Sequence, residues 1–142
     1  MRVFFSICVS VLLCLSSHVA SAADECGDFL RAMVGVSDTI EYVKCDSEPE
    51  RQSAPLTALY RIKGRDAQAV EQYLHDKFGV SEYLKFVCCL WEVRGMTSYE
   101  DKKTGITYHI RMSSEETIYN KRDDWGKIGY FYITVVRFME DV

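Results

Sequence analysis

The sequence lacks several motifs by which enzymes and metal proteins are often recognised. No serine lies in a Gly-x-Ser-x-Gly elbow, no cysteines have Cys-x-x-Cys spacing, and no pair of histidines has the spacing of a zinc site. Only two prolines and three histidines occur in 142 residues. The sequence therefore predicts neither a metal nor a cofactor, and it favours a protein that is not an enzyme.

Basic residues are also fewer than acidic residues. Lys and Arg number 17 against 21 Asp and Glu, which gives a formal net charge of −4 at pH 7. Phosphate backbones are bound by clustered Lys and Arg, so nucleic acid is a poor candidate partner.

After the first twenty residues the chain has no second long apolar run. The first residues are those of a secretory signal, because Arg2 precedes an apolar stretch from Val3 to Leu15 and a small-residue site, Ala20-Ser21-Ala22. The apolar stretch is shorter than the roughly 18 residues of a membrane span. We expect residues 1–22 to be a signal peptide and residues 23–142 to form a single domain without stable membrane insertion, located in the periplasm or secreted. An uncleaved anchor or a lipoprotein signal fits the pattern less well.

Four cysteines remain after the predicted cleavage: Cys26, Cys45, Cys88 and Cys89. An even number in an exported domain predicts two disulfides, for which three connectivities are possible. On a strand, Cys88 and Cys89 would point to opposite faces, which favours bridges from them to Cys26 and Cys45. A bridge between the two adjacent cysteines would instead close a strained ring.

Hydrophobic periodicity and turn residues divide the mature chain into helices and strands. The run LTALYRIK alternates apolar and polar residues, and the following RDAQAVEQYLHDKFG has an apolar helical stripe that ends at a glycine. We expect helices at 24–34 and 66–78, a short helical turn at 113–116, strands at 39–45, 56–63, 85–93 and 130–138, a hairpin over 96–112, and irregular chain at 121–129.

This order predicts an α+β domain. Its antiparallel sheet would contain about five strands packed on one long helix, with a short N-terminal helix and two disulfides. The strand at 85–93 is apolar on both faces from Phe86 to Leu90 and is expected at the centre of the sheet.

The proline-containing loop over 46–55 is a candidate binding element. It is polar and carries Glu48, Glu50 and Arg51 between two predicted strands. Loops of this kind project from a rigid scaffold and often carry function. We expect the protein to bind another periplasmic or secreted protein, as an inhibitor or immunity-type factor would.

A second candidate is a surface patch formed by Asp123, Asp124, Trp125, Tyr130 and Tyr132. Tyrosine and tryptophan are enriched at the centres of protein interfaces. The alternative interpretation is a solvated turn whose tryptophan packs on the core, beside tyrosines that belong to the core and rim of the sheet.

Two other function classes stay open at this stage. A small hydrolase or carbohydrate-active protein could use either of the adjacent aspartates with His109, provided that these groups converge. A small-ligand carrier would need a pocket between helix and sheet, lined by residues such as Tyr60, Leu74 and Trp91.

Several segments together resemble a known family. They are Cys45 with its polar loop, PLTALYRIKGRDAQAVEQYL from Pro55, CCLWE from Cys88 and KRDDWGKIGYFYITV from Lys121. In these segments the chain is similar to small exported bacterial proteins classified only as a domain of unknown function. The resemblance implies a periplasmic location in a Gram-negative cell, and it implies no activity and no site residues.

Overall fold

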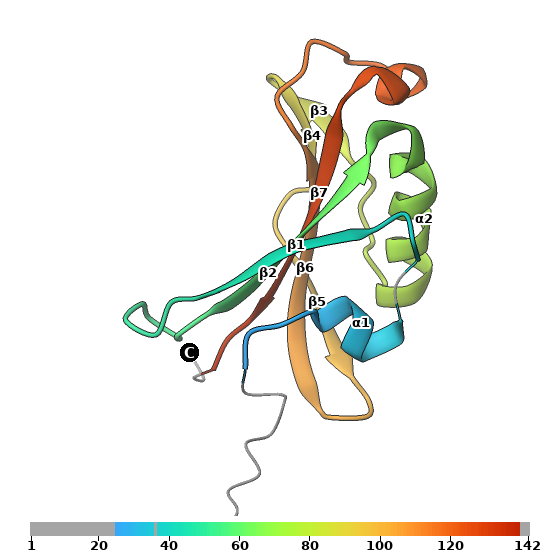
Figure 1. Cartoon of the computed structure of the whole chain (residues 1–142). Coiled ribbons are helices and arrows are strands. Elements are labelled where there is room, and N and C mark those ends of the chain that lie inside the picture. The colour runs from blue at the N-terminus through green and yellow to red at the C-terminus, as the bar shows by residue number, and fades with distance from the viewer. Residues whose placement is uncertain (1–24, 36, 140–142) are drawn as a thin grey trace, which may run out of the picture.

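The fold is a strongly twisted antiparallel sheet with helices on one side (Figure 1). The computed structural model describes residues 25–35 and 37–139. Its strands are β1 (Glu41–Ser47), β2 (Leu56–Lys63), β3 (Lys85–Val87), β4 (Leu90–Glu92), β5 (Thr97–Asp101), β6 (Ile106–Ser114) and β7 (Tyr130–Arg137). Its helices are α1 (Phe29–Val34) and α2 (Ala67–Phe78), with two 3-10 helices, η1 (Gly64–Asp66) and η2 (Arg122–Lys127).

The long strands form the middle of the sheet. The strand order is β1-β2-β7-β6-β4-β3, and β5 pairs with β6 beside β4. β2 pairs with β7 over its full length, from Leu56 opposite Arg137 to Lys63 opposite Tyr130. The last strand of the chain therefore lies between the second and the sixth.

The core lies between the sheet and the helices. Side chains of β2 alternate between buried and partly exposed, and the same period of two runs along β6 and β7. Tyr60, Phe131 and Ile133 are completely buried on the inner face. Leu30 of α1 and Leu74 of α2 are 1% exposed and close the core from the helical side.

Both helices cover the same face of the sheet (Figure 1). α1 is held there by the Tyr60 hydroxyl, which accepts a hydrogen bond from the Leu30 N–H at 3.0 Å, and by a disulfide between Cys26 and Cys45. The segment before α1 is thereby tied to β1. The opposite face of the sheet carries no helix of the described chain.

The expected architecture of about five strands on one long helix is wrong, although the class is α+β. The sheet has seven strands, and α2, the longer α-helix, has only 12 residues. The expected pair of disulfides is also wrong: among the described residues Cys26 is joined to Cys45, and Cys88 and Cys89 are free.

The predicted central strand at 85–93 is a hairpin at the edge of the sheet. β3 and β4 pair through Phe86 with Trp91 and Val87 with Leu90, and the two cysteines form the turn between them. The turn has no glycine, asparagine or proline to mark it. Because the apolar run continues through the turn, the sequence pattern is that of one strand.

Most of the other predicted elements are present with small shifts. The strand at 56–63 and the helix after Asp66 are confirmed, as is the hairpin over 96–112. The short N-terminal helix begins later than expected, because Asp28 caps it by accepting a hydrogen bond from the Arg31 N–H. The helical turn expected at 113–116 is replaced by the end of β6, and part of the segment expected to be irregular forms η2. The predicted signal, residues 1–22, lies outside the described residues.

Candidate binding face

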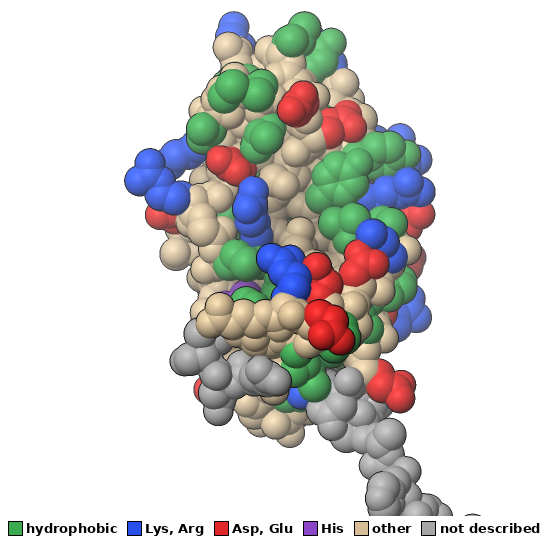
Figure 2. Space-filling view, turned by 90° about the vertical axis from the view of Figure 1, so that its left-hand side faces the viewer, with side chains coloured by type: hydrophobic (Ala, Val, Ile, Leu, Met, Phe, Trp, Pro, Cys, Tyr) green, Lys and Arg blue, Asp and Glu red, His purple; other side chains and the backbone are tan. Residues whose placement is uncertain are grey.

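The side of the sheet that the helices leave uncovered is called the open face from here on. Figure 2 looks directly at this side. The period of two places on it the partly exposed residues of each long strand, which alternate with core residues. They include Leu59 and Arg61 of β2, Arg111 and Ser113 of β6, Tyr130, Tyr132 and Thr134 of β7, and Leu90 and Glu92 of β4.

Tyr132 lies in a cross-strand row on this face. In the register of the sheet it is opposite Ser113 on one side and Arg61 on the other, and Arg61 is opposite Glu41. Arg61 donates from Nε and Nη2 to the two carboxylate oxygens of Glu41, each at 2.7 Å. Hydrogen bonding to Arg61 lowers the pKa of the Glu41 carboxyl, so this pair is ionised at neutral pH.

The guanidinium of Arg61 also lies 5.1 Å from the centre of the Tyr130 ring. A cation at this distance from an aromatic ring is attracted by the ring face. Glu41 and Tyr130 together hold Arg61 flat against the sheet. The arginine is thus positioned before any partner arrives.

A second arginine is held in the same way at the other side of the tyrosines. Arg111 donates from Nη2 to Glu92 at 3.0 Å, and both side chains stay partly exposed. Tyr130 and Tyr132 therefore lie between two arginine–carboxylate pairs, which make the surface polar on both sides of an aromatic centre.

Apolar side chains continue from the tyrosines toward the β3–β4 end of the sheet. Val87 is 49% exposed, and Leu90 opposite it is half-buried. The Thr117 N–H donates to the Cys89 carbonyl at 2.6 Å, which places the neighbouring Ile118, 87% exposed, beside this hairpin. Hydrophobic side chains gather toward the same end in Figure 2.

A cleft of about 410 Å³ opens beside Tyr130. Three basic and three acidic residues line it with Thr39 and Tyr130, namely Arg61, Lys63 and Arg65, and Asp38, Glu41 and Asp66. The two signs balance, so the cleft has no excess charge to select a small anion. Its chemistry suits the rim of a protein interface, which is polar and carries both signs.

The predicted loop site lies at the opposite end of β2 and β7 from Tyr130 and Tyr132. Glu48, Glu50 and Arg51 belong to the β1–β2 connection, which projects from the opposite end of the sheet (Figure 1). Arg51 Nη1 binds the Glu48 carboxylate at 3.0 Å, and the Arg51 N–H donates to the Glu48 carbonyl. The loop is a folded turn that neutralises one of its own acids. The structure does not bring it together with Tyr130 and Tyr132.

The predicted surface patch is divided by the structure. Trp125 is only 2% exposed, and its ring packs 4.9 Å from Phe131, so it is not part of a surface patch, and the alternative interpretation of a tryptophan packed on the core holds. Asp124 is bound to Lys127 at 2.7 Å, as in a solvated helical turn. Of the five residues, Tyr130 and Tyr132 share the open face.

The groups proposed for a hydrolase do not converge. His109 lies in β6 opposite Val136, where its Nδ1 is 3.1 Å from the Ser98 hydroxyl. Asp123 and Asp124 lie in η2, which precedes Tyr130 at the other end of β7. Six residues of strand separate the two positions, about 20 Å. The arrangement forms no shared acid-base site.

The residues proposed to line a carrier pocket fill the core instead. Tyr60 and Leu74 are 0% and 1% exposed, and Trp91 is 6% exposed. The Trp91 ring packs 5.1 Å from the Trp125 ring, and its Nε1 donates to the Tyr119 carbonyl. These contacts occupy the space in which a ligand would have to bind.

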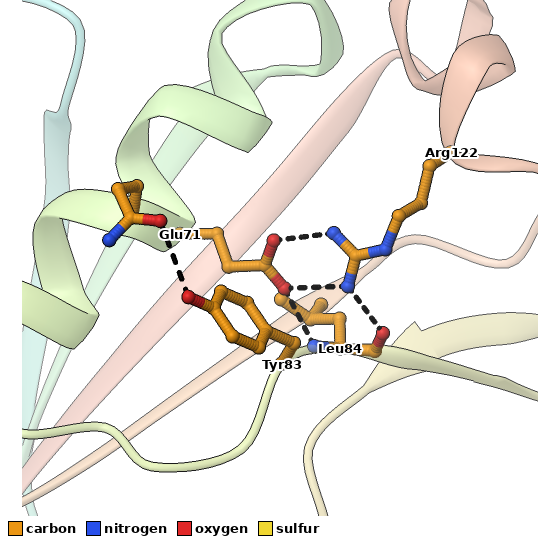
Figure 3. A network of polar contacts seen from close by, with 5 residues as sticks. Glu71, Tyr83, Leu84 and Arg122 are labelled. Atoms are coloured by element: carbon orange, nitrogen blue, oxygen red, sulfur yellow. Dashed lines mark hydrogen bonds and ion pairs between the residues drawn. The ribbon is translucent and has the colours of Figure 1, made fainter.

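A buried ion pair was not predicted from the sequence (Figure 3). Glu71 is 6% exposed and accepts from Arg122 Nη1 at 2.6 Å, from Arg122 Nη2 at 3.1 Å and from the Leu84 N–H at 2.6 Å. Arg122 Nη2 also donates to the Leu84 carbonyl at 2.8 Å, and the guanidinium lies 4.6 Å from the Trp125 ring centre. The network fastens the chain before β3 to α2 and η2. Because Glu71 and Arg122 are 51 residues apart, no local sequence pattern indicates that they form a pair.

No three His, Cys, Asp or Glu side chains of the described residues are grouped to hold a metal ion. No helix within residues 25–35 and 37–139 is both long and apolar enough to cross a membrane.

Comparison with known proteins gives one result. A family model described as a domain of unknown function, DUF4952, matches residues 16–91, more than half of the chain. The chain belongs to the DUF4952 family. The match includes α1, β1, β2, α2 and the double-cysteine turn, and it ends at Trp91 of β4. Neither the curated proteins nor the solved structures include a significant match to this DUF4952 chain.

Proposed function

We propose that this protein is an exported, non-enzymatic binding protein whose open face receives another protein. The observation that carries the proposal is the set of half-exposed aromatic and apolar residues at one end of a sheet face without a helix. Tyr130 and Tyr132 lie there on β7, and Leu90 and Val87 lie on β4 and β3, beyond β6, which carries Ser113 opposite Tyr132. Protein interfaces are built around such a centre, with a polar rim.

The arginines at the edges of the face support the same function. Arginine and tyrosine are the residue types, with tryptophan, that contribute most to binding at interface centres. Arg61 and Arg111 are already held by Glu41 and Glu92. A partner that accepts hydrogen bonds from them loses less side-chain entropy than it would with free arginines. An inhibitor or immunity-type factor needs a preformed surface of this kind.

Export and location are part of the proposal. The apolar leader predicted at residues 1–22 and the disulfide between Cys26 and Cys45 support a periplasmic or secreted protein, because disulfides persist in oxidising compartments. The partner would then be another protein of the same compartment.

Site-specific photo-crosslinking tests the binding face. A benzophenone amino acid replaces Tyr132 in one variant and Lys102, on the exposed β5–β6 turn, in a matched control. In cells that export the protein, we expect one discrete adduct from position 132 and none from position 102. Mass spectrometry of the adduct then identifies the partner.

Calorimetry with the purified partner separates the open face from the β1–β2 loop. We expect Tyr132→Ala to weaken binding by at least about tenfold, a loss typical of an interface residue that contributes strongly. Glu50→Lys should leave the affinity unchanged, provided that both variants keep the circular dichroism spectrum of the wild type. Loss of binding with Glu50→Lys but not with Tyr132→Ala would assign the partner to the loop and contradict the proposal.

A further inference from the structure

The two adjacent cysteines occupy an unusual backbone position. Cys88 and Cys89 form the whole turn between β3 and β4, and Cys88 has a φ of +57°. The Cys89 N–H donates to the Val87 carbonyl at 2.7 Å, which closes a three-residue γ-turn of the rare positive-φ type. Glycine or asparagine would adopt this conformation with less strain. Backbone strain of this kind is concentrated at functional sites.

The turn brings the two thiols into contact. The Sγ atoms of Cys88 and Cys89 are 2.9 Å apart, and the Cys88 side chain is exposed to solvent while that of Cys89 is half-buried. The other cysteines of the described chain, Cys26 and Cys45, are joined to each other. Within the described residues each thiol of the turn therefore has only its neighbour as a bonding partner.

We propose that Cys88 and Cys89 form a redox site that exchanges electrons with external disulfides and cycles between a dithiol and a vicinal disulfide. The substrate class is an accessible disulfide, such as that of oxidised glutathione or of a strained protein bridge. The site is independent of protein binding through the open face, so either proposal can fail without the other.

The exchange proceeds in two displacements. The exposed Cys88 thiolate attacks one sulfur of the external disulfide, expels the first thiolate and forms a mixed disulfide. The Cys89 thiolate then attacks the Cys88 sulfur, expels the second thiolate and closes the ring. The two protons lost by the cysteines are taken up by the two thiolates released. The cysteines lose two electrons, and the external disulfide gains them.

The environment of the thiols favours this order of attack. Contact with the Cys88 thiol is the largest cause that raises the pKa of Cys89, followed by burial and by the charges of Cys88 and Glu116. Cys89 is therefore the weaker nucleophile at the start. Once Cys88 is part of a mixed disulfide, its thiol no longer acts on Cys89, which ionises more readily and resolves the intermediate.

Covalent geometry makes the ring disulfide easy to reduce again. Consecutive Cα atoms are 3.8 Å apart across a trans peptide, whereas disulfides without strain join Cα atoms about 4.4 to 6.8 Å apart. Cys26 and Cys45, with Cα atoms 5.5 Å apart, lie within that range. Strained and exposed bridges are the labile ones. One chain thus holds a stable structural bridge and a labile exchange site.

Redox titration in glutathione buffers tests the site. The protein is equilibrated at graded ratios of oxidised to reduced glutathione, quenched with acid, alkylated and digested with trypsin. Cleavage after Lys85 and Arg94 yields a peptide, 86–94, that carries Cys88 and Cys89 and no other cysteine. We expect the reduced peptide to carry two alkyl groups, and the oxidised peptide to carry none and to weigh two hydrogen atoms less than the unmodified dithiol peptide. Reduction of the Cys26 to Cys45 bridge should require at least about tenfold more reduced glutathione.

Three results would overturn the proposal. They are two glutathione adducts on peptide 86–94, a dithiol that resists oxidation throughout the titration, and reduction of both bridges at the same glutathione ratio. None of them depends on finding a protein partner.

Matched single variants test the order of attack. In oxidised glutathione, Cys89→Ser should accumulate a stable mixed disulfide on Cys88. Cys88→Ser should form its adduct at least about tenfold more slowly, because Cys89 is less accessible to an external disulfide than Cys88. Circular dichroism checks that both variants are folded. Equal rates in the two variants would contradict Cys88 as the attacking thiol.

Discussion

The buried ion pair between Glu71 and Arg122 should contribute strongly to stability, and its removal is a test of the packing described above. Glu71→Ala leaves the Arg122 guanidinium and the Leu84 N–H without their carboxylate partner at a site where Glu71 is 6% exposed. Breaking a buried pair costs 3 to 5 kcal/mol. The Arg122 side chain is 34% exposed, so water compensates in part, and we expect a loss of about 3 kcal/mol.

Urea unfolding followed by circular dichroism measures this loss in a double-mutant cycle. Glu71→Ala, Arg122→Ala and the double variant should give a coupling energy of about 2 kcal/mol, because the double variant no longer contains an unpaired charge. Glu71→Ala alone should lower the melting temperature by roughly 10 °C.

The exposed pair between Arg51 and Glu48 provides the control cycle. Its side chains are 68% and 40% exposed, and its coupling should stay below about 0.5 kcal/mol. If the cycle of Glu71 and Arg122 gave an equally small coupling, the reasoning that this network fastens the chain before β3 would be refuted.

Three further predictions concern the core and the disulfide. Gly64→Ala should destabilise the fold by about 3 kcal/mol, because its Cβ would collide with two main-chain carbonyl oxygens at the end of η2. The Cβ of Gly126→Ala meets open space, so this control should change the free energy of unfolding by less than about 0.5 kcal/mol. Urea unfolding compares the two variants. Burial raises the pKa of Tyr60 far above its ordinary value of 10.0, so only the unfolded state ionises as the pH rises through 10. The unfolding free energy of the wild type should therefore fall above pH 10 relative to that of Tyr60→Phe. A difference between the two unfolding free energies that does not change with pH would argue against this. Replacing Cys26 and Cys45 by serine opens a loop with a sequence separation of 19 and should lower the free energy of unfolding by about 3 kcal/mol. Denaturant titration measures this loss. An unchanged midpoint would mean that the bridge does not constrain the unfolded chain.

Where local signals agreed, the sequence was sufficient to predict the structure. The run from Leu56 to Lys63 alternates at period two, and the helix after Asp66 has an apolar stripe and ends at Gly79 in the left-handed conformation. The apolar residues that the pattern assigns to the core are buried in both elements. The strand from Tyr130 follows the same rule.

The errors arise where hydrophobic periodicity carries no information about the direction of the chain. Phe86 to Leu90 is apolar throughout, so periodicity could not reveal that the chain reverses at Cys88 and Cys89. Without that reversal the strand count and the disulfide pairing were both wrong. Trp125 was ambiguous for a different reason, since its burial depends on contacts with residues distant in sequence such as Trp91.

The candidate binding face was predictable only in part. Tyr130 and Tyr132 were recognised as a pair from their spacing on one strand, and the sheet confirms that they share a face. Arg61 and Arg111 could not be added from the sequence, because the strand order β2-β7-β6 that places them at either side of the tyrosines is set by long-range pairing.

Hydroxyl-radical footprinting of the complex with the crosslinked partner tests the binding face most directly. Tyr130 and Tyr132 should be oxidised several-fold more slowly in the complex than in the free protein. Tyr83, which is 44% exposed and stacks on His75 of α2 at the helical side, should keep its rate. Protection of Tyr83 with unchanged oxidation of Tyr130 and Tyr132 would place the partner on the helices and contradict the account.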